Sequence, residues 1–279
     1  MVTIAKTKQP VRMPRFGHRV DKTDPILRGC VGWWPLNDGA GRKAKDIVGT
    51  NDLSGSGGYG WSNQSIGTVA ASDGVDAKFS GSSLGQIEDF TISFWGYYDG
   101  TNNLSDFASN RVLGIAGAYP GFVFGSSGNS APIRFFVDDG SGNSATLEGA
   151  KVSYLPNDTW LNFCGTWDQS SQSIKIYIDG VDLTTSFSLS ATGSTIGVFT
   201  SSDNFTVAGR PGTTTRSLGG NMQNLRFYNR ALSATEVSRL YTEPWAGLEP
   251  LSPFSFFSVP TAGAPLAVFY NHYKNQGII

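Results

Sequence analysis

The sequence predicts an all-β protein in which two antiparallel sheets pack face to face and one short helix follows near the end. Short apolar runs recur between clusters of Gly, Ser, Asn and Thr, which is the pattern of many strands joined by turns. Aromatic residues make up 13% of the 279 residues and charged residues only 15%, so the chain carries enough apolar surface for a sizeable core. The runs follow no fixed period, which argues against a propeller or a solenoid.

The clearest strand is expected over residues 90–98. Alternation places four apolar side chains on its core face, namely Phe90, Ile92, Phe94 and Tyr98. Residues 172–179 alternate in the same way, and Asp179-Gly180 then predicts a type I′ hairpin turn, in which both central residues need positive φ. Further strands are expected near residues 30–36, 75–80, 111–116, 121–124, 132–138, 160–167, 204–208 and 221–228.

One helix is expected over residues 234–241. Ser233 can cap its first turn, and Glu236 three positions later can return the hydrogen bond, which makes a capping box. The Glu243-Pro244 dipeptide ends the helix, because the residue before a proline avoids helical backbone angles. Ten or more strands with a single short helix indicate a β-sandwich.

The chain divides into an extended basic arm over residues 1–28, a strand-rich body over 29–242 and an apolar tail over 243–279. The arm holds seven basic and two acidic residues, whereas residues 29–279 hold 14 basic and 20 acidic ones. Such an arm can bind an acidic protein neighbour through Arg12, Arg15 and Arg19, in preference to nucleic acid or an anionic lipid. The alternative is a solvated tail.

The tail is too apolar for a free linker and too rich in proline for a helix. Its aromatic residues include Trp245, Phe254, Phe256 and Phe257. A segment of this kind must pack on its own body or on a neighbour. We therefore expect the arm and the tail to serve assembly into a larger structure, with a second copy of the chain among the partners.

Four blocks of the body resemble laminin-G-like, concanavalin A-like domains and occur in the same order. They are Gly32–Gly39 for the opening strand, Asp46–Asp52 for the loop that follows, Trp160–Asp168 with Gln172–Gly180 for the central hairpin, and Asn224–Ser233 for the closing strand and capped helix. The resemblance covers most of residues 30–242 and implies a two-sheet antiparallel jelly-roll sandwich. It leaves the function open, because one fold serves many functions.

The same resemblance implies a calcium ion between the loop after the first strand and the closing strand. Asp46 and Asn51 would supply hard oxygen ligands of the kind that calcium prefers. Gln223 stands where the family usually has an acid, so one negative charge is missing. The alternative is a turn in which Asp46 and Asn51 hydrogen-bond to the backbone.

Carbohydrate binding would need exposed aromatic rings, which offer a flat apolar platform. Tyr59 and Trp61, expected in a Gly/Ser-rich loop, are the first candidates. Trp95 and Tyr97, on the face of their strand opposite to Phe94, are the second pair. The alternative is burial under a loop or at a subunit contact.

Catalysis is not expected. Glycosidases of related fold need two carboxylates that flank the scissile bond, and none of the five Glu residues has another acid at i+2 or i+4 in such an arrangement. Glu88 and Asp89 are adjacent, so on a strand they would point to opposite faces, and we expect the pair to lie in a solvated turn. The two His residues, His18 and His272, lie in the arm and the tail, so the body offers no imidazole to activate a nucleophile.

The segment Leu240–Trp245 also resembles the way such domains end in structural proteins of tailed bacteriophages. This resemblance implies a non-catalytic virion protein, either a capsid decoration protein or a tail or fibre component, which contacts other virion proteins through its arms. A carbohydrate-binding module for host-surface glycans is the alternative. No signal-like or membrane-spanning apolar run occurs, so we expect synthesis in the host cytoplasm, no membrane insertion and a final location in the virion.

Overall fold

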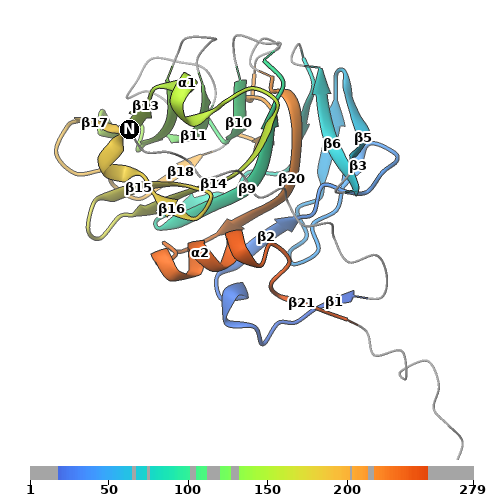
Figure 1. Cartoon of the computed structure of the whole chain (residues 1–279). Coiled ribbons are helices and arrows are strands. Elements are labelled where there is room, and N and C mark those ends of the chain that lie inside the picture. The colour runs from blue at the N-terminus through green and yellow to red at the C-terminus, as the bar shows by residue number, and fades with distance from the viewer. Residues whose placement is uncertain are drawn as a thin grey trace, which may run out of the picture. The chain divides into compact units, whose positions relative to one another are not determined.

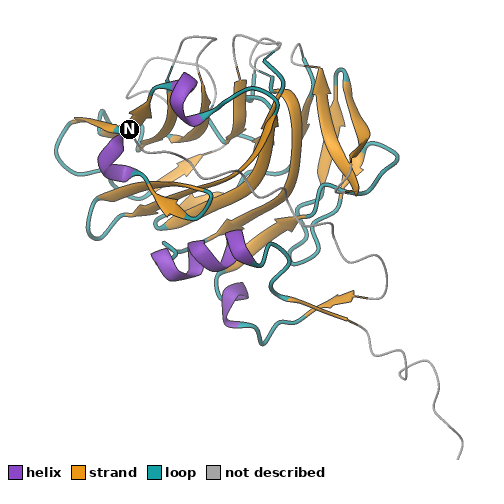
Figure 2. Cartoon of the chain, viewed as in Figure 1, coloured by secondary structure: helices purple, strands orange, loops and turns teal. Residues whose placement is uncertain are grey.

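The computed structural model describes residues 18–64, 67–73, 76–100, 105–111, 120–126, 132–201, 203–212 and 217–250. Most of the regular structure in these stretches is β-strand (Figures 1 and 2). Within them, residues 20–247 belong to one compact unit, and residues 18–19 and 248–250 belong to a second.

Two antiparallel sheets form the sandwich in the first unit. In spatial order, the nine-stranded sheet contains β17 (Ser188–Thr192), β13 (Ser144–Gly149), β12 (Ile133–Asp138), β11 (Gly121–Ser126), β10 (Ser105–Ser109), β19 (Thr206–Val207), β7 (Lys78–Ser80), β4 (Leu53–Ser56) and β3 (Lys43–Ala44). The eight-stranded sheet contains β16 (Val181–Asp182), β15 (Ser173–Ile178), β14 (Thr159–Asp168), β9 (Phe90–Tyr98), β20 (Gly219–Tyr228), β6 (Gly67–Asp73) and β5 (Tyr59–Gln64), and β2 (Cys30–Trp34) also pairs with β20. The predicted two-sheet β-sandwich is confirmed.

Smaller elements complete the described chain. A two-stranded sheet joins β8 (Gly85–Ile87) to β18 (Phe199–Ser201). The helical elements are η1 (Pro25–Leu27), α1 (Lys151–Tyr154), η2 (Thr184–Ser186) and α2 (Ala234–Thr242). Another two-stranded sheet joins β1 (His18–Val20) to β21 (Leu248–Pro250), where Arg19 Nε lies 2.5 Å from Glu249 Oε1.

Phenylalanine rings from both sheets fill the core between them. All four residues expected on the core face of β9 are fully buried there. The Phe94 ring centroid lies 5.1 Å from that of Phe107 on β10 and 5.3 Å from that of Phe124 on β11. Two mid-strand glycines make room for these rings, because a Cβ at Gly96 would lie 2.9 Å from Phe107 and one at Gly165 2.9 Å from Phe135. The alternation of β9 was therefore predicted correctly.

The predicted hairpin and helix are also confirmed. Asp179 and Gly180 both have positive φ, at 52° and 75°, and they connect β15 to β16. Ser233 accepts a hydrogen bond from Glu236 N and Glu236 Oε2 accepts one from Ser233 N at 2.9 Å, so the capping box is formed. Figure 1 shows α2 along the outer face of the eight-stranded sheet, where Tyr241 stacks on Trp95 with 5.7 Å between ring centroids.

The predicted boundaries of the body were too narrow at both ends. Ile26 is 1% exposed, and Asp24 receives two hydrogen bonds from Arg239 of α2, at 2.7 and 2.8 Å. Trp245, expected to serve assembly, is 8% exposed and stacks on Trp33 with ring centroids 6.5 Å apart. Residues 21–28 and 243–247 therefore pack with the sandwich and are not free arms.

Candidate functional site

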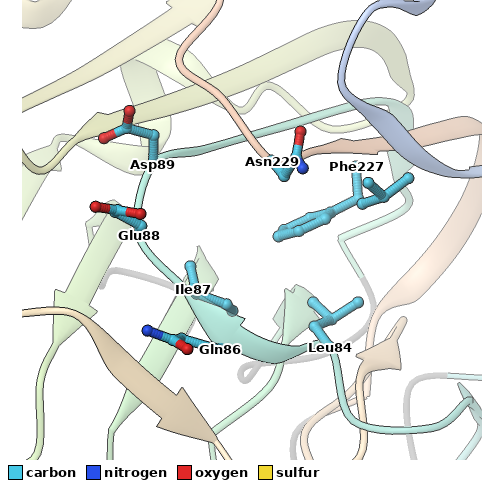
Figure 3. A pocket seen from close by; sticks show the side chains of 8 residues that line it. Leu84, Gln86, Ile87, Glu88, Asp89, Phe227 and Asn229 are labelled. Atoms are coloured by element: carbon cyan, nitrogen blue, oxygen red, sulfur yellow. The ribbon is translucent and has the colours of Figure 1, made fainter.

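A cavity of about 400 Å³ opens at the end of the sandwich where β9 begins and β20 ends (Figure 3). We call it the β8 pocket, and its lining residues are Val31, Leu84, Gln86, Ile87, Glu88, Asp89, Phe227 and Asn229. They come from β2, from β8 with its flanking loops, and from the end of β20. Its volume lies in the range of small-molecule sites.

Local hydrogen bonds hold the segments that line the β8 pocket. β8 pairs with β18, and Ser83 Oγ donates to the carbonyl oxygen of Ser201 while it accepts from Gly85 N at 3.0 Å. Gly85 has φ of 72°, a backbone angle that favours glycine and allows the chain to turn into β8. Asp89 Oδ1 accepts from Gln169 N at 2.8 Å, which fixes the loop between β8 and β9. Hydrogen bonds thus hold the backbone segments of the pocket wall in place.

The β8 pocket combines apolar walls with polar groups. Phe227 and Ile87 are 3% and 4% exposed, whereas Val31 is 44% exposed and offers a solvent-facing aliphatic edge. Glu88 and Asp89 lie on one side of the pocket, and Phe227 and Asn229 lie on the other (Figure 3). The lining includes two carboxylates and, among the described residues, no Lys or Arg, so the pocket is an acidic site.

The two carboxylates lie in a bend and not on a strand, in line with the solvated turn expected for them. Glu88 and Asp89 occupy the bend that precedes β9, and both line the β8 pocket. They occupy adjacent positions on one side of it (Figure 3). A glycosidase needs its two carboxyl groups on either side of the scissile bond, and this placement does not supply that.

Asp46 ties the loop after β2 to the strand. Its Oδ1 accepts from Trp33 N, Val48 N and Gly49 N at 3.0, 3.1 and 2.9 Å, and its Oδ2 accepts from Asn51 N at 3.2 Å. Three of these donors share Oδ1 and occupy its lone pairs, and the fourth bonds Oδ2, so backbone amides engage both carboxylate oxygens.

The other two expected calcium ligands are placed differently. Asn51 Oδ1 accepts from Ser82 N at 2.7 Å. Gln223 is 1% exposed and lies opposite Trp95 of β9 in the sheet register. In the described part of the chain, no group of three or more His, Cys, Asp or Glu side chains could hold a metal ion. Asp46, Asn51 and Gln223 therefore do not fit an open calcium site, and the hydrogen-bonded turn describes Asp46 better.

Tyr59 and Trp61 lie in β5 and not in a loop. Both rings are partly buried against Phe79, with centroid distances of 4.9 and 5.6 Å. Tyr59 Oη and Trp61 Nε1 both donate to the carbonyl oxygen of Gly41, at 3.0 and 3.1 Å. The two rings close the edge of the core, so they do not form the free platform that the sequence suggested.

Trp95 and Tyr97 face away from the core, as expected, but Trp95 is only 1% exposed because Tyr241 covers it. For Trp95 the structure agrees with the alternative of burial, although helix α2 and not a loop covers the ring. Tyr97 packs on Trp160 at 5.6 Å and donates to Asp158 at 2.9 Å. The remaining expected assembly residues, Arg12, Arg15, Phe254, Phe256 and Phe257, lie outside the described residues, and so does most of the strand expected near 111–116.

Most of the pocket residues were missed by the sequence reasoning. β8 and β18 are three residues long and have too few positions to show an alternating pattern. Phe227 was assigned to a strand, and nothing in its neighbours indicates that its ring also lines a cavity. Glu88 gave the one usable signal, since it is one of five Glu residues in the chain.

Comparisons with known proteins place this geometry in a family. A laminin G family model, described as the concanavalin A-like lectin/glucanases superfamily, matches residues 70–238, more than half of the chain. A comparison with curated proteins gave no match. No helix in the described stretches is long and apolar enough to cross a membrane.

Solved structures of the same fold include both binding domains and enzymes. Domain 4 of AbnA, a GH43 extracellular arabinanase from Geobacillus stearothermophilus in complex with arabinotriose, is 15% identical, with a TM-score of 0.54 over 81% of this chain and 100% of that one. The binding domain of botulinum neurotoxin DC in complex with SialylT is 13% identical, with a TM-score of 0.55 over 78% and 52%. Trypanosoma rangeli sialidase is 14% identical, with a TM-score of 0.53 over 78% and 34%. The chain thus spans about half of the neurotoxin domain and a third of the sialidase, and at these identities the likeness shows the fold alone.

Proposed function

Because the chain belongs to the concanavalin A-like lectin/glucanases superfamily, we propose that it is a non-catalytic module that binds an uncharged carbohydrate in the β8 pocket. The observation that carries this proposal is the composition of the pocket wall. The exposed Val31 and the partly buried Leu84 offer apolar surface for the C–H face of a sugar ring. Gln86, Glu88 and Asn229 offer hydrogen-bonding groups for its hydroxyls.

The charge of the pocket favours a neutral sugar over an acidic one. Glu88 and Asp89 would repel the carboxylate of a sialic or uronic acid, and no Lys or Arg lines the pocket to compensate. A carboxylate accepts hydroxyl hydrogen bonds strongly, so Glu88 suits a sugar with free hydroxyls. The arabinotriose bound to domain 4 of the arabinanase is uncharged and supports the proposal by analogy.

Titration calorimetry with arabinotriose, other neutral oligosaccharides and sialyllactose tests the proposal. We expect at least one neutral sugar to bind, and Glu88→Gln and Asn229→Ala to weaken it about tenfold, which corresponds to about 1.4 kcal/mol for one lost hydrogen bond. Asn204→Ala is the matched control, because Asn204 lines a different cavity of about 410 Å³. Equal affinity in all three variants, or binding of sialyllactose alone, would refute the assignment.

The non-catalytic part of the proposal has its own test. Prolonged incubation with neutral oligosaccharides and aryl glycosides should release no product, because the two carboxylates lie on one side of the pocket (Figure 3). They therefore cannot stand on either side of the glycosidic bond of a bound sugar. Turnover that is present in the wild type and lost in Glu88→Gln would contradict this.

A role in the virion of a tailed bacteriophage is the second candidate. It is favoured by the basic residues of positions 1–28, by the apolar residues of 243–279 and by the resemblance of Leu240–Trp245 to the ends of phage structural domains. In this role the sandwich would be displayed on a capsid or tail, with other virion proteins as partners. Antibody labelling of purified particles, viewed by electron microscopy, tests it, and particles without label would count against it.

A further inference from the structure

β17 forms one edge of the nine-stranded sheet and is fully accessible. Among the residues that the structure describes, it pairs with β13 alone. All five of its residues are exposed, and the exposure continues to residue 195. The sequence around it carries no Asp, Glu, Lys or Arg from residue 183 to residue 202. The edge therefore presents unpaired backbone groups in an uncharged stretch.

Two aliphatic side chains on this side of the sandwich face the core but are not covered. Leu189 of β17 lies opposite Leu147 in the register, and residues opposite each other share a face, yet Leu147 is 0% exposed and Leu189 is 63% exposed. Val181 of β16, the edge strand of the other sheet, lies opposite the buried Ile178 and is 55% exposed. The apolar interior thus reaches the surface along both edge strands.

Two of the other edge strands of the sandwich are protected in the usual manner, whereas the edge strand β5 is six residues long and uncharged. β3 and β16 are two residues long and carry the charged residues Lys43 and Asp182. Natural sheets use short edge strands and charges to prevent edge-to-edge association. β17 has neither protection, so its edge is suited to accept another strand.

We propose that β17 pairs antiparallel with β17 of a second copy of this chain across a two-fold axis. A two-fold contact brings the same surface of both copies together, so the surface must not repel itself. Residues 29–279 have six more acidic than basic residues, so two copies repel each other over most of their surface. The stretch from 183 to 202 is uncharged, and two copies can approach each other there without electrostatic repulsion between charged side chains. The pairing would extend the nine-stranded sheet from one copy into the next and bring Leu189 into the contact.

Light scattering of the full chain tests the pairing. We expect twice the mass of one chain for the wild type, and Leu189→Lys should lower the mass to that of one chain because it places a charge at the contact. Val31→Lys is the matched control, since Val31 is also an exposed aliphatic residue on a strand but lies on β2. A wild type that stays monomeric at 100-fold different concentrations overturns the proposal, and so does a dimer that survives Leu189→Lys.

Disulfide trapping locates the contact without reliance on destabilising variants. Leu189→Cys, Ser190→Cys and Ala191→Cys should give at least one cross-linked dimer under mild oxidation, because opposite residues of paired strands are close enough for a disulfide. The native Cys30 and Cys164 are buried and free, so they should not compete. Lys43→Cys on the other edge of the same sheet is the control. Cross-linking at residue 43 alone would show that another surface forms the dimer, and it would overturn the proposal. A dimer that forms only after residues 251–279 are removed would likewise count against β17 pairing in the full chain.

Discussion

Replacement of Asp46 by alanine removes the acceptor for four backbone N–H groups at once. These are the amides of Trp33, Val48, Gly49 and Asn51, at 2.9 to 3.2 Å from the carboxylate oxygens. Asp46 itself is 8% exposed, and its bond to Trp33 N is buried. The substitution therefore tests whether this carboxylate anchors the loop to β2 or serves an ion.

The decrease in the free energy of unfolding depends on how deeply each N–H donor is buried. Loss of the buried, charge-assisted bond to Trp33 N costs about 1.5–3 kcal/mol, whereas the three partly buried donors can turn to water and lose roughly 0.5–1 kcal/mol each. The total is about 3–6 kcal/mol. For a folded region of this size, each 1 kcal/mol lowers the Tm by about 2–4 °C, so we expect a decrease of roughly 6–24 °C.

Calorimetric unfolding in EDTA and in millimolar calcium is the assay. The decrease should be the same in both, and calcium should leave the wild-type Tm unchanged. Asp182→Ala is the control, because exposed Asp182 accepts one local bond, from Thr184 N, and its loss should cost under about 1 kcal/mol. If calcium raises the Tm of the wild type and not of Asp46→Ala, the carboxylate binds the ion and the reasoning fails.

Three further predictions concern the helix, the hairpin and the ends of the body. Ser233→Ala should lower the free energy of unfolding by about 1 kcal/mol in urea titration, because it removes the cap of α2. Burial raises the pKa of Asp179 from 3.8 to about 6, so the folded state binds its proton more tightly and stability falls as the pH rises from about 4 to 6. Asp179→Asn should remove this loss, with a gain of about 1–2 kcal/mol at pH 7.5 and none at pH 4 in the same assay. Deletion of residues 1–17 should leave the Tm unchanged, whereas deletion of 1–28 should cost at least about 2 kcal/mol through the buried Ile26.

The parts of the fold that the sequence predicted are those with strong local signals. β9 alternates over nine residues, so its core face could be assigned without knowledge of its neighbours. The Asp179-Gly180 turn and the Ser233 capping box depend on residues within a few positions of each other. Each of these features is decided by short-range chemistry, and each is present in the structure as expected.

The β8 pocket could not be predicted because sheet register assembles it. Its residues come from positions 31, 84–89 and 227–229, which only the pairing of β2 with β20 and the position of β8 bring together. The charged pair of Arg210 with Asp106, 2.6 Å apart and almost fully buried, joins positions 104 residues apart in the same way. No local pattern carries information about contacts of this range.

The cover formed by α2 explains why Trp95 is buried and is not a sugar-binding platform. Alternation correctly placed Trp95 on the outer face, and an outer face is usually exposed to water. In this sandwich Tyr241 of α2 stacks on Trp95, so the ring is buried on a face that the pattern marks as polar.

The same row of the sheet continues through polar residues. Asn162 and Gln223 lie opposite Trp95 on its two neighbouring strands and are 2% and 1% exposed. The Gln223 amide and the Asn162 Oδ1 have no protein partner among the described residues, although burial of such groups is costly. Gln223 was expected to ligate calcium because of its place in the closing strand, but it belongs to this buried row, and Asp46 is bound to β2 and its own loop. Alternation therefore identified the face of each residue, and only the packing of α2 decided which side chains of that face remain available to a ligand.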